Sequence, residues 1–181
     1  MQLPANLENL RLKLEEKFSN QITEPWLLVD SGGQLLYMIA DAAELRQFSV
    51  STSKYGMGCH QDSFMTPLGA HQIAEKIGDQ QQINEIFVGR VASGETAEII
   101  DDAKPSERDL ILTRILWLHG LEENKNCGEG VDSFQRYIYI HGTHEEGLLG
   151  TPASHGCIRM SNADIIDLYQ QVSVGTFVYI V

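Results

Sequence analysis

The residues with the most evident chemical potential lie close together near the C-terminus. Cys157 stands in the segment 154–159, which reads Ser-His-Gly-Cys-Ile-Arg, and the pair His141-Gly142 precedes it. Only the thiolate of a cysteine attacks a carbonyl, and an ordinary thiol with a pKa of about 8.5 is mostly protonated at neutral pH. A neighbouring histidine that accepts the thiol proton removes this obstacle. The pattern therefore predicts a cysteine nucleophile, with His141 or His155 as its base.

The neighbours of the cysteine suit the same chemistry. His141 follows residues 136–140, an aromatic and branched run that predicts a strand, so we expect the histidine at the end of that strand. Gly156 permits a tight turn whose amide N–H groups could stabilise an oxyanion. Arg159 offers a planar fork of donors, which suits the carboxylate of a peptide substrate. Recognition and attack could share one short segment.

A metal site is the alternative interpretation of these residue types. Three zinc-binding side chains plus a water molecule would make a catalytic zinc centre, and the candidate ligands are His141, His144, His155 and Cys157. The step from His141 to His144 is shorter than the four-residue step of the familiar helical zinc motif. An isolated cysteine can also be a small buried hydrophobic residue without any catalytic role. We expect a thiol mechanism without metal or cofactor, and a zinc-dependent hydrolase is the competing hypothesis.

These residues carry a resemblance to a known family. The segment from Tyr137 to Val181, and more loosely the chain from Trp26 onward, resembles the L,D-transpeptidase catalytic domain, also called the YkuD-like family. The hallmark of that family is a histidine followed downstream by Ser/Thr-His-Gly-Cys, an apolar residue, and Arg or Asn. His141 and the segment 154–159 match it at every position.

Two upstream segments extend the resemblance. Residues 48–53 (Phe-Ser-Val-Ser-Thr-Ser) resemble a VSTG-like strand end of the family, and residues 66–69 (Thr-Pro-Leu-Gly) resemble its TPxG turn. Ser53 stands where glycine is usual. This departure concerns the geometry of the local turn.

The resemblance implies a role for each motif residue. Cys157 would be the nucleophile, His141 its general base, and Gly142 the third member of the catalytic group, whose carbonyl oxygen orients the imidazole. The residues expected to line the oxyanion region or to lie near the substrate are Ser154, His155, Gly156, Cys157 and Arg159.

The resemblance also implies a substrate class. Members of the family attack the bond between the L-centre of a diamino acid, usually meso-diaminopimelate, and a following D-alanine in peptidoglycan stem peptides. D-Alanine leaves and a thioester remains on the cysteine. An amine from a second stem then gives a cross-link, whereas water gives a trimmed tripeptide. L,D-transpeptidases and L,D-carboxypeptidases therefore share their first step.

The hydrophobic pattern predicts a mainly β protein with flanking helices, and the resemblance implies the β-sandwich or barrel-like catalytic domain of the family over residues 25–181. Residues 1–24 are predicted as an N-terminal amphipathic helix, because apolar residues recur there at helical spacing. Period-two and continuous apolar runs predict strands at 25–30, 34–40, 44–51, 71–77, 83–91, 110–118 and 176–181. A turn is expected near Asp41, polar loops at 93–108 and 121–133, and a helix from Ser161 onward.

Composition narrows the partners. The 181 residues suit one compact unit, and the formal net charge of −12 argues against nucleic acid and against anionic membrane surfaces as partners. Three cysteines are an odd number in a chain too large to need disulfide bonds, so we expect reduced thiols. The expected partners are peptidoglycan stem peptides or muropeptides.

The N-terminal residues bear on location. Residues 1–20 lack a basic region followed by an apolar run, and no stretch approaches the roughly 18 apolar residues of a membrane span. If Met1 is the native start, we expect a cytoplasmic protein; if a leader was removed, a periplasmic one. Stem peptides in the cytoplasm come from wall turnover, and water is the abundant acceptor there. We therefore favour an L,D-carboxypeptidase of muropeptide recycling over an L,D-transpeptidase that forms cross-links or a non-catalytic wall-peptide binder.

Overall fold

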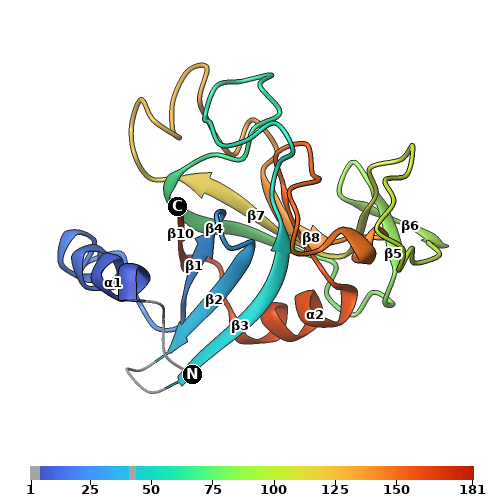
Figure 1. The fold of residues 1–181 in the computed structure, drawn as a ribbon, viewed down its shortest axis with the longest axis horizontal. Helices are drawn as coiled ribbons and strands as arrows, with labels where there is room; N and C mark the ends of the chain where they lie inside the picture. The colour runs from blue at the N-terminus through green and yellow to red at the C-terminus, as the bar shows by residue number, and fades with distance from the viewer. Residues whose placement is uncertain (1–4, 41–43) are drawn as a thin grey trace.

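The computed structural model describes residues 5–40 and 44–181. Within them the chain is mainly β, with two α-helices and one short 3-10 helix (Figure 1). In chain order the elements are α1 (Ala5–Lys17), β1 (Trp26–Asp30), β2 (Leu35–Ala40), β3 (Glu44–Ser51), β4 (Gly69–Ile77), β5 (Glu85–Val88), β6 (Val91–Thr96), β7 (Ile111–Gly120), β8 (Tyr139–Gly142), η1 (Glu146–Leu148), β9 (Ile158–Met160), α2 (Asn162–Gln171) and β10 (Phe177–Ile180).

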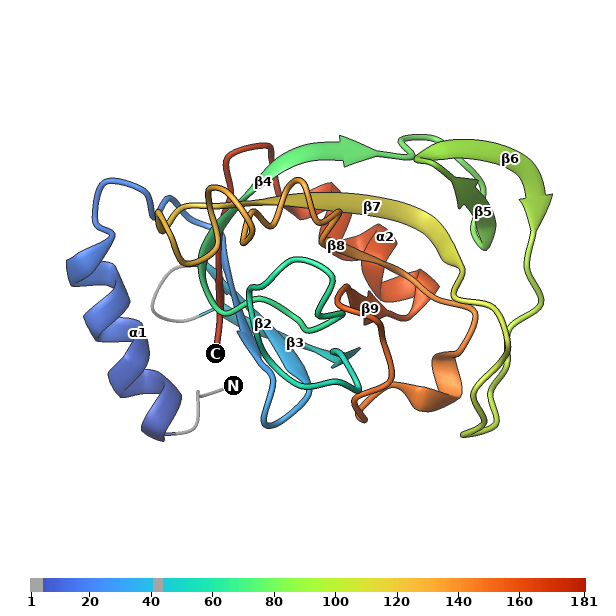
Figure 2. The same cartoon turned by 90° about the horizontal axis from the view of Figure 1, so that it is seen from above.

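The strands close into a barrel. In the described part of the chain they follow one another in the order β4-β10-β1-β2-β3-β9-β8-β7, and β4 pairs again with β7. The β5–β6 hairpin continues the sheet beyond β7 and lies at the opposite side of the molecule from α1 (Figure 2). Most neighbours are antiparallel, but β1 pairs with β10 and β8 pairs with β9 in parallel. Closure leaves few unpaired strand edges.

Apolar side chains fill the barrel, and α2 contributes to the same core. Its apolar face packs Ile165 and Leu168 among Leu27, Ile73 and Leu116 from the strands, all of them buried. Burial of side chains of this size stabilises the fold by about 1.5–3 kcal/mol each. The core therefore holds β8 and β9, which carry the functional motif, in a fixed frame.

A second core lies under the N-terminal helix. Leu7, Leu14 and Phe18 of the α1 region are buried against a cluster that includes Trp26 and Phe177. The predicted amphipathic pattern thus describes a helix that packs on the barrel. No helix among the described residues is both long and apolar enough to cross a membrane.

Most of the predicted elements are confirmed. The mainly β class is correct, β1, β2 and β3 form the predicted antiparallel meander, and α2 begins after Ser161, whose hydroxyl accepts the Asp164 amide. The predicted turn near Asp41 and the first four residues of the predicted helix lie outside the described residues.

Four boundaries were predicted wrongly. The helix predicted to reach residue 24 ends at Lys17, after which the chain turns toward β1. The expected strand 83–91 is interrupted, because Gly89 and Arg90 both adopt positive φ (55° and 68°) and turn the chain between β5 and β6. The expected loop 93–108 begins with most of β6. The side chains of this strand are largely exposed, and those from residue 93 onward include no apolar one that would indicate a strand. The strand expected at 136–140 begins only at Tyr139, because Tyr137 adopts a left-handed φ of 57°.

Candidate active site

Strand pairing places the predicted base and nucleophile on one face of the barrel. In the parallel pair β8–β9, Ile140 stands opposite Ile158 and His141 stands opposite Arg159. Side chains alternate along a strand, so His141 and Arg159 share a face. Cys157 lies in the bend directly before β9 and packs against Tyr139, which precedes His141 by two residues on the same face of β8. Ile140 and Ile158 point the other way and are fully buried in the core. The two apolar residues thus fix the direction of the two reactive ones.

His141 is held in one orientation by the backbone. Its Nδ1 lies 2.8 Å from the carbonyl oxygen of Gly142, and the residue is 1% exposed. Because a carbonyl oxygen only accepts hydrogen bonds, Nδ1 carries the proton and Nε2 of the neutral ring is free to accept one. Burial lowers the pKa of His141 to about 4, against the opposing effects of the Gly142 carbonyl and Asp109. The imidazole is therefore neutral at pH 7.

The atoms around Gly142 lie so close that no side chain would fit at this position. A Cβ at this position would lie 2.5 Å from Oδ1 of Asn162 and 2.9 Å from the carbonyl oxygen of Leu112. Asn162 at the start of α2 donates through Nδ2 to the carbonyl oxygen of Thr143, at 2.7 Å. The end of β8 is thereby clamped to α2, and the Gly142 carbonyl that orients His141 is fixed with it.

Cys157 is half-buried beside an aromatic cluster. It packs with Trp117 and Tyr139, and its Sγ lies 3.4 Å from the carbonyl oxygen of Tyr137. Burial raises the pKa of the Cys157 thiol to about 12, although a backbone hydrogen bond from Tyr139 opposes this effect. The thiol is therefore protonated in the free protein, as the imidazole of His141 is neutral.

Ser154 organises the turn that presents Cys157. Its hydroxyl accepts the Gly156 amide at 3.2 Å and donates to the carbonyl oxygen of Cys157 at 2.6 Å. Gly156 adopts a φ of 125°, a conformation that favours glycine. The resemblance implied that Ser154 lies in the oxyanion region or near the substrate. In the structure Ser154 is fully buried inside the turn. The Gly156 amide is likewise already engaged.

Ser53, which stands where the family usually has glycine, uses its side chain for hydrogen bonds within the site. Its hydroxyl donates to the carbonyl oxygen of Phe64 at 2.5 Å and accepts the Tyr55 amide at 3.0 Å. Its amide donates to Oγ1 of Thr66, and the residue forms an isolated bridge with Ser154. The segment 54–66 is thus tied to the turn that presents the cysteine.

Arg159 is buried, and carboxylates of the chain hold both of its terminal nitrogens. It is 2% exposed, and it donates through Nη1 to Glu145 and through Nη2 to Asp109, both at 2.6 Å. Two carboxylates of the chain thus hold the terminal nitrogens of the fork that was expected to bind a substrate carboxylate, and the buried Nε has no partner among the described residues. A buried arginine requires such partners, since an unpaired charge inside a protein is very costly.

Asp109 is a site residue that sequence reasoning missed. Its Oδ2 lies 2.7 Å from Nδ1 of His155, and its Oδ1 accepts from Arg159. Burial favours its neutral acid, but Arg159, His141 and His155 outweigh burial and hold the pKa of Asp109 below its ordinary value. A lone aspartate at the end of a polar loop gives no signal in the sequence, and its pairing depends on a segment about fifty residues away.

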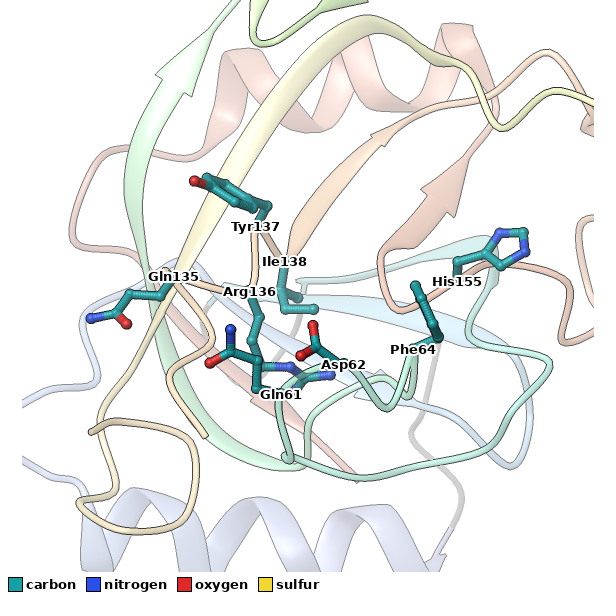
Figure 3. Close-up of a pocket in the computed structure, with 8 residues that line it drawn as sticks. All are labelled: Gln61, Asp62, Phe64, Gln135, Arg136, Tyr137, Ile138 and His155. Carbon is teal, nitrogen blue, oxygen red and sulfur yellow. The ribbon is translucent and has the colours of Figure 1, made fainter. Parts of the chain in front are cut away.

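A cavity opens beside the motif (Figure 3). It has a volume of about 180 Å³ and lies between the segments 61–64 and 135–138, with His155 at one side. Its lining residues are Gln61, Asp62, Phe64, Gln135, Arg136, Tyr137, Ile138 and His155. Tyr137, whose carbonyl oxygen lies near the Cys157 sulfur, connects the cavity to the nucleophile. None of the first seven residues was predicted as a site residue.

The four candidate zinc ligands do not converge as a set. His144 Nε2 lies 2.7 Å from the Ser106 hydroxyl, while Nδ1 of His141 and of His155 are bonded as described above. Across residues 5–40 and 44–181, no group of three or more His, Cys, Asp or Glu side chains is placed to hold a metal ion.

Comparison with known sequences identifies the family. The sequence pattern of the L,D-transpeptidase catalytic domain (YkuD) matches residues 24–180. "Putative L,D-transpeptidase YqjB" of Bacillus subtilis (strain 168) is 49% identical over 45 residues, which are 25% of this chain and 26% of that protein. "Probable L,D-transpeptidase YbiS" of Escherichia coli (strain K12) is 46% identical over 41 residues, which are 23% of this chain and 13% of that protein. These matches span only a small part of either relative.

Comparison with solved structures supports the fold. An L,D-transpeptidase from Mycobacterium smegmatis superimposes with a TM-score of 0.51 at 19% identity, over 87% of this chain and 58% of that chain. L,D-transpeptidase 3 from Mycobacterium tuberculosis gives a TM-score of 0.53 at 16% identity, over 87% and 60%. The shared barrel and the family match over residues 24–180 agree, and the chain belongs to the L,D-transpeptidase catalytic-domain family.

Proposed function

We propose that this chain is a cysteine-dependent L,D-carboxypeptidase, which removes the terminal D-alanine from the tetrapeptide stems of peptidoglycan fragments through a thioester on Cys157. The main support is that Cys157 packs against Tyr139 on the face of β8 that carries His141, and that Nδ1 of His141 is held by the Gly142 carbonyl at 2.8 Å. That contact leaves Nε2 as the proton acceptor. The mechanism below follows from these groups.

Acylation begins from a neutral pair. Because the pKa of the thiol is raised to about 12 and the pKa of the imidazole is lowered to about 4, no stable ion pair precedes attack. The proton moves from Sγ to Nε2 of His141 as Sγ attacks the carbonyl carbon of the diamino acid. His141 then returns this proton to the departing amine, the C–N bond breaks, and D-alanine leaves. A thioester remains on Cys157.

Backbone amides of the turn would stabilise the oxyanion. Since Ser154 already engages the Gly156 amide, the amides of His155 and Cys157 are the proposed donors. Loss of one such donor in a preorganised site typically costs about 2.7–4 kcal/mol of transition-state stabilisation. Ser154 acts by holding the turn that carries these amides.

Water is the proposed acceptor of the acyl group. Hydrolysis needs no second binding site, because a water molecule positioned by Nε2 of His141 attacks the thioester, passes a proton to the imidazole and releases the tripeptide. His141 then returns the proton to the sulfur. Cross-linking requires instead a second stem peptide held beside the thioester. It is the second candidate function, and the naming of YqjB and YbiS as L,D-transpeptidases favours it.

Product analysis distinguishes the two functions. Purified protein is incubated with a diaminopimelate tetrapeptide, with and without excess tripeptide as amine acceptor, and D-alanine, tripeptide and dimer are followed by mass spectrometry. The tetrapeptide carries an isotope label, so that newly formed tripeptide is told apart from the added acceptor. We expect D-alanine and labelled tripeptide in equal amounts under both conditions, and an acylated Cys157 in the intact protein. Accumulation of dimer faster than tripeptide would assign the chain to the transpeptidases.

The control variant is Cys157→Ser. A hydroxyl lacks the acidity of a thiol, so turnover should fall to background while the fold is retained. Turnover by this variant at the wild-type rate would exclude the thioester. Loss of activity in the wild type on addition of a chelator, with the thiol intact, would favour the zinc hypothesis instead.

A further inference from the structure

Arg136 differs from the other arginine of the site in having no acidic partner. Among the described residues it forms no ion pair, although it lines the cavity beside Cys157. It is half-buried, and this burial lowers the pKa of its guanidinium below its ordinary value. A partly desolvated cation at the wall of a cavity interacts strongly with an anion placed there. An unpaired guanidinium in this position therefore indicates an anionic ligand group.

The known contacts of Arg136 leave some of its donors unused. Nη1 donates to the carbonyl oxygen of Gly58 at 3.2 Å, and Nη2 donates to the Ser63 hydroxyl at 3.4 Å and to the carbonyl oxygen of Met65 at 2.7 Å. A guanidinium has five N–H donors, so these contacts orient the group without exhausting it. All three acceptors are neutral. Arg136 thus keeps its charge and part of its donor capacity for a ligand.

Asp62 brings the opposite charge to the same cavity. It is exposed and lines the cavity with Arg136, and its charge raises the pKa of that guanidinium, although the two form none of the ion pairs found among the described residues. Figure 3 shows both side chains reaching into the space between the segments 61–64 and 135–138, whereas the imidazole of His155 points away from them. The cavity therefore presents one cation and one anion that do not neutralise each other by direct contact.

The cavity also has an apolar part close to the nucleophile. Phe64 and Ile138 belong to its lining, and Ile138 follows Tyr137, whose carbonyl oxygen lies 3.4 Å from Sγ of Cys157. A ligand attached to the sulfur and extending into the cavity would pass Phe64 and Ile138 before it reaches the charged side chains of Arg136 and Asp62. A short methylene chain that ends in both an ammonium and a carboxylate has this pattern of properties.

We propose that Arg136 and Asp62 select the zwitterionic end of a diaminopimelate side chain, with Arg136 on its carboxylate and Asp62 on its ammonium group. This proposal rests on the proposed function, because it places the acyl carbon of the same residue at Cys157. A lysine side chain has the methylene chain and the ammonium but no carboxylate. Amidation of the distal carboxylate likewise removes the group that Arg136 would bind. The cavity thus predicts specificity for the diamino acid, at residues outside the sequence motif.

The test uses four synthetic tetrapeptides that differ at the third residue. This residue is meso-diaminopimelate, its distally amidated form, L-lysine, or 2-aminopimelate, which keeps the distal carboxylate but lacks the ammonium. We expect the wild type to prefer the diaminopimelate stem over the amidated and lysine stems by at least about tenfold in kcat/KM, as for other charge-assisted hydrogen bonds. Equal rates for these three stems would overturn the proposal.

Variants assign the preference to each residue. Arg136→Gln should raise KM for the diaminopimelate stem and bring its advantage over the amidated stem to within about twofold, while Arg136→Lys should keep part of it. Asp62→Asn should weaken the three stems that carry an ammonium by a few-fold only, because Asp62 is exposed, and should spare 2-aminopimelate. Lys13→Gln, an exposed charge on α1, is the matched control and should behave as the wild type.

Two outcomes separate this proposal from a structural role and from the proposed function. If Arg136→Gln lowers the rates on all four stems equally, Arg136 merely holds the segment 58–65 and the specificity claim is wrong. Binding of the four stems to Cys157→Ser is measured in parallel by calorimetry, so that the selectivity is tested even without turnover. Selective binding without acylation of the wild type would retain the specificity claim and overturn the proposed function, whereas acylation by all stems alike would do the reverse.

Discussion

Two regions of the molecule meet at Cys157, and their electrostatics differ. On the strand side, Arg159 is buried and its charge is balanced by Glu145 and Asp109 at 2.6 Å. On the loop side, Arg136 is half-buried and contacts only neutral acceptors. Both arginines stand near the nucleophile, but only one has its charge satisfied within the chain.

The difference separates two tasks. The strand side positions reactive groups, and the charges of Arg159 and Glu145 must be paired internally because both side chains are buried. The loop side can leave a charge unpaired, because solvent and ligand reach it. Motif matching alone selects Arg159 as the substrate-binding arginine, whereas burial and pairing select Arg136. Each prediction below tests one of these assignments.

The largest effect is expected at the base. His141→Gln removes the only proton acceptor that the proposed mechanism uses, so kcat/KM should fall by about a hundredfold or more. The pH dependence of kcat/KM in the wild type should also reflect the lowered pKa of His141. Activity should persist as pH falls through 6.5 and decline only toward about 4, where the imidazole becomes protonated. Initial rates of D-alanine release across this range, at pH values where the fold is intact, provide the check. An acidic limb centred near 6.5 would contradict the buried, neutral base.

The reactive part of the site was predictable because it is contiguous in sequence. The pair His141-Gly142 ends β8, and the segment 154–159 leads into β9, which pairs with β8 in parallel. The mainly β class and α2 followed from apolar periodicity and from the Ser161 cap. These features depend on residues that are close in the chain or that repeat regularly along it.

The rest of the site depends on segments that are far apart in sequence. Asp109 meets His155 across 46 residues, and Arg136 meets Met65 across 71 residues. A single sequence carries no periodicity or spacing that reports such pairs. Backbone turns were missed for a related reason: Arg90 and Tyr137 adopt a left-handed φ, a conformation that these residue types rarely prefer.

A second effect should distinguish the two arginines by stability. Arg159→Leu leaves the carboxylate of Glu145, which is 4% exposed, without its cation, and we expect a loss of about 3–5 kcal/mol in the free energy of unfolding. Arg136→Leu removes contacts to neutral acceptors only, so its loss should stay below about 2 kcal/mol. Chemical denaturation of both variants measures the difference.

The double variant Arg159→Leu/Glu145→Gln is the matched control for this pair. Since it removes the buried charge together with its partner, it should recover part of the stability lost in Arg159→Leu. The contrary result is an equal loss of unfolding free energy in Arg159→Leu and Arg136→Leu, with no recovery in the double variant. It would mean that the ion pairs of Arg159 do not account for the difference between the strand side and the loop side.

The smallest effect concerns the turn between the two regions. Ser154→Ala removes the hydroxyl that accepts the Gly156 amide and donates to the Cys157 carbonyl oxygen, at a cost of about 1–2 kcal/mol for the groups left unpaired. Because Ser154 is fully buried and has no access to a substrate, the variant should lower kcat and leave KM nearly unchanged. Ser154→Thr keeps the hydroxyl and should retain most of the rate. Steady-state kinetics of both variants, with a thermal melt of each, separate the two possibilities: a rise in KM at constant kcat would return Ser154 to the substrate-binding surface that the resemblance implied.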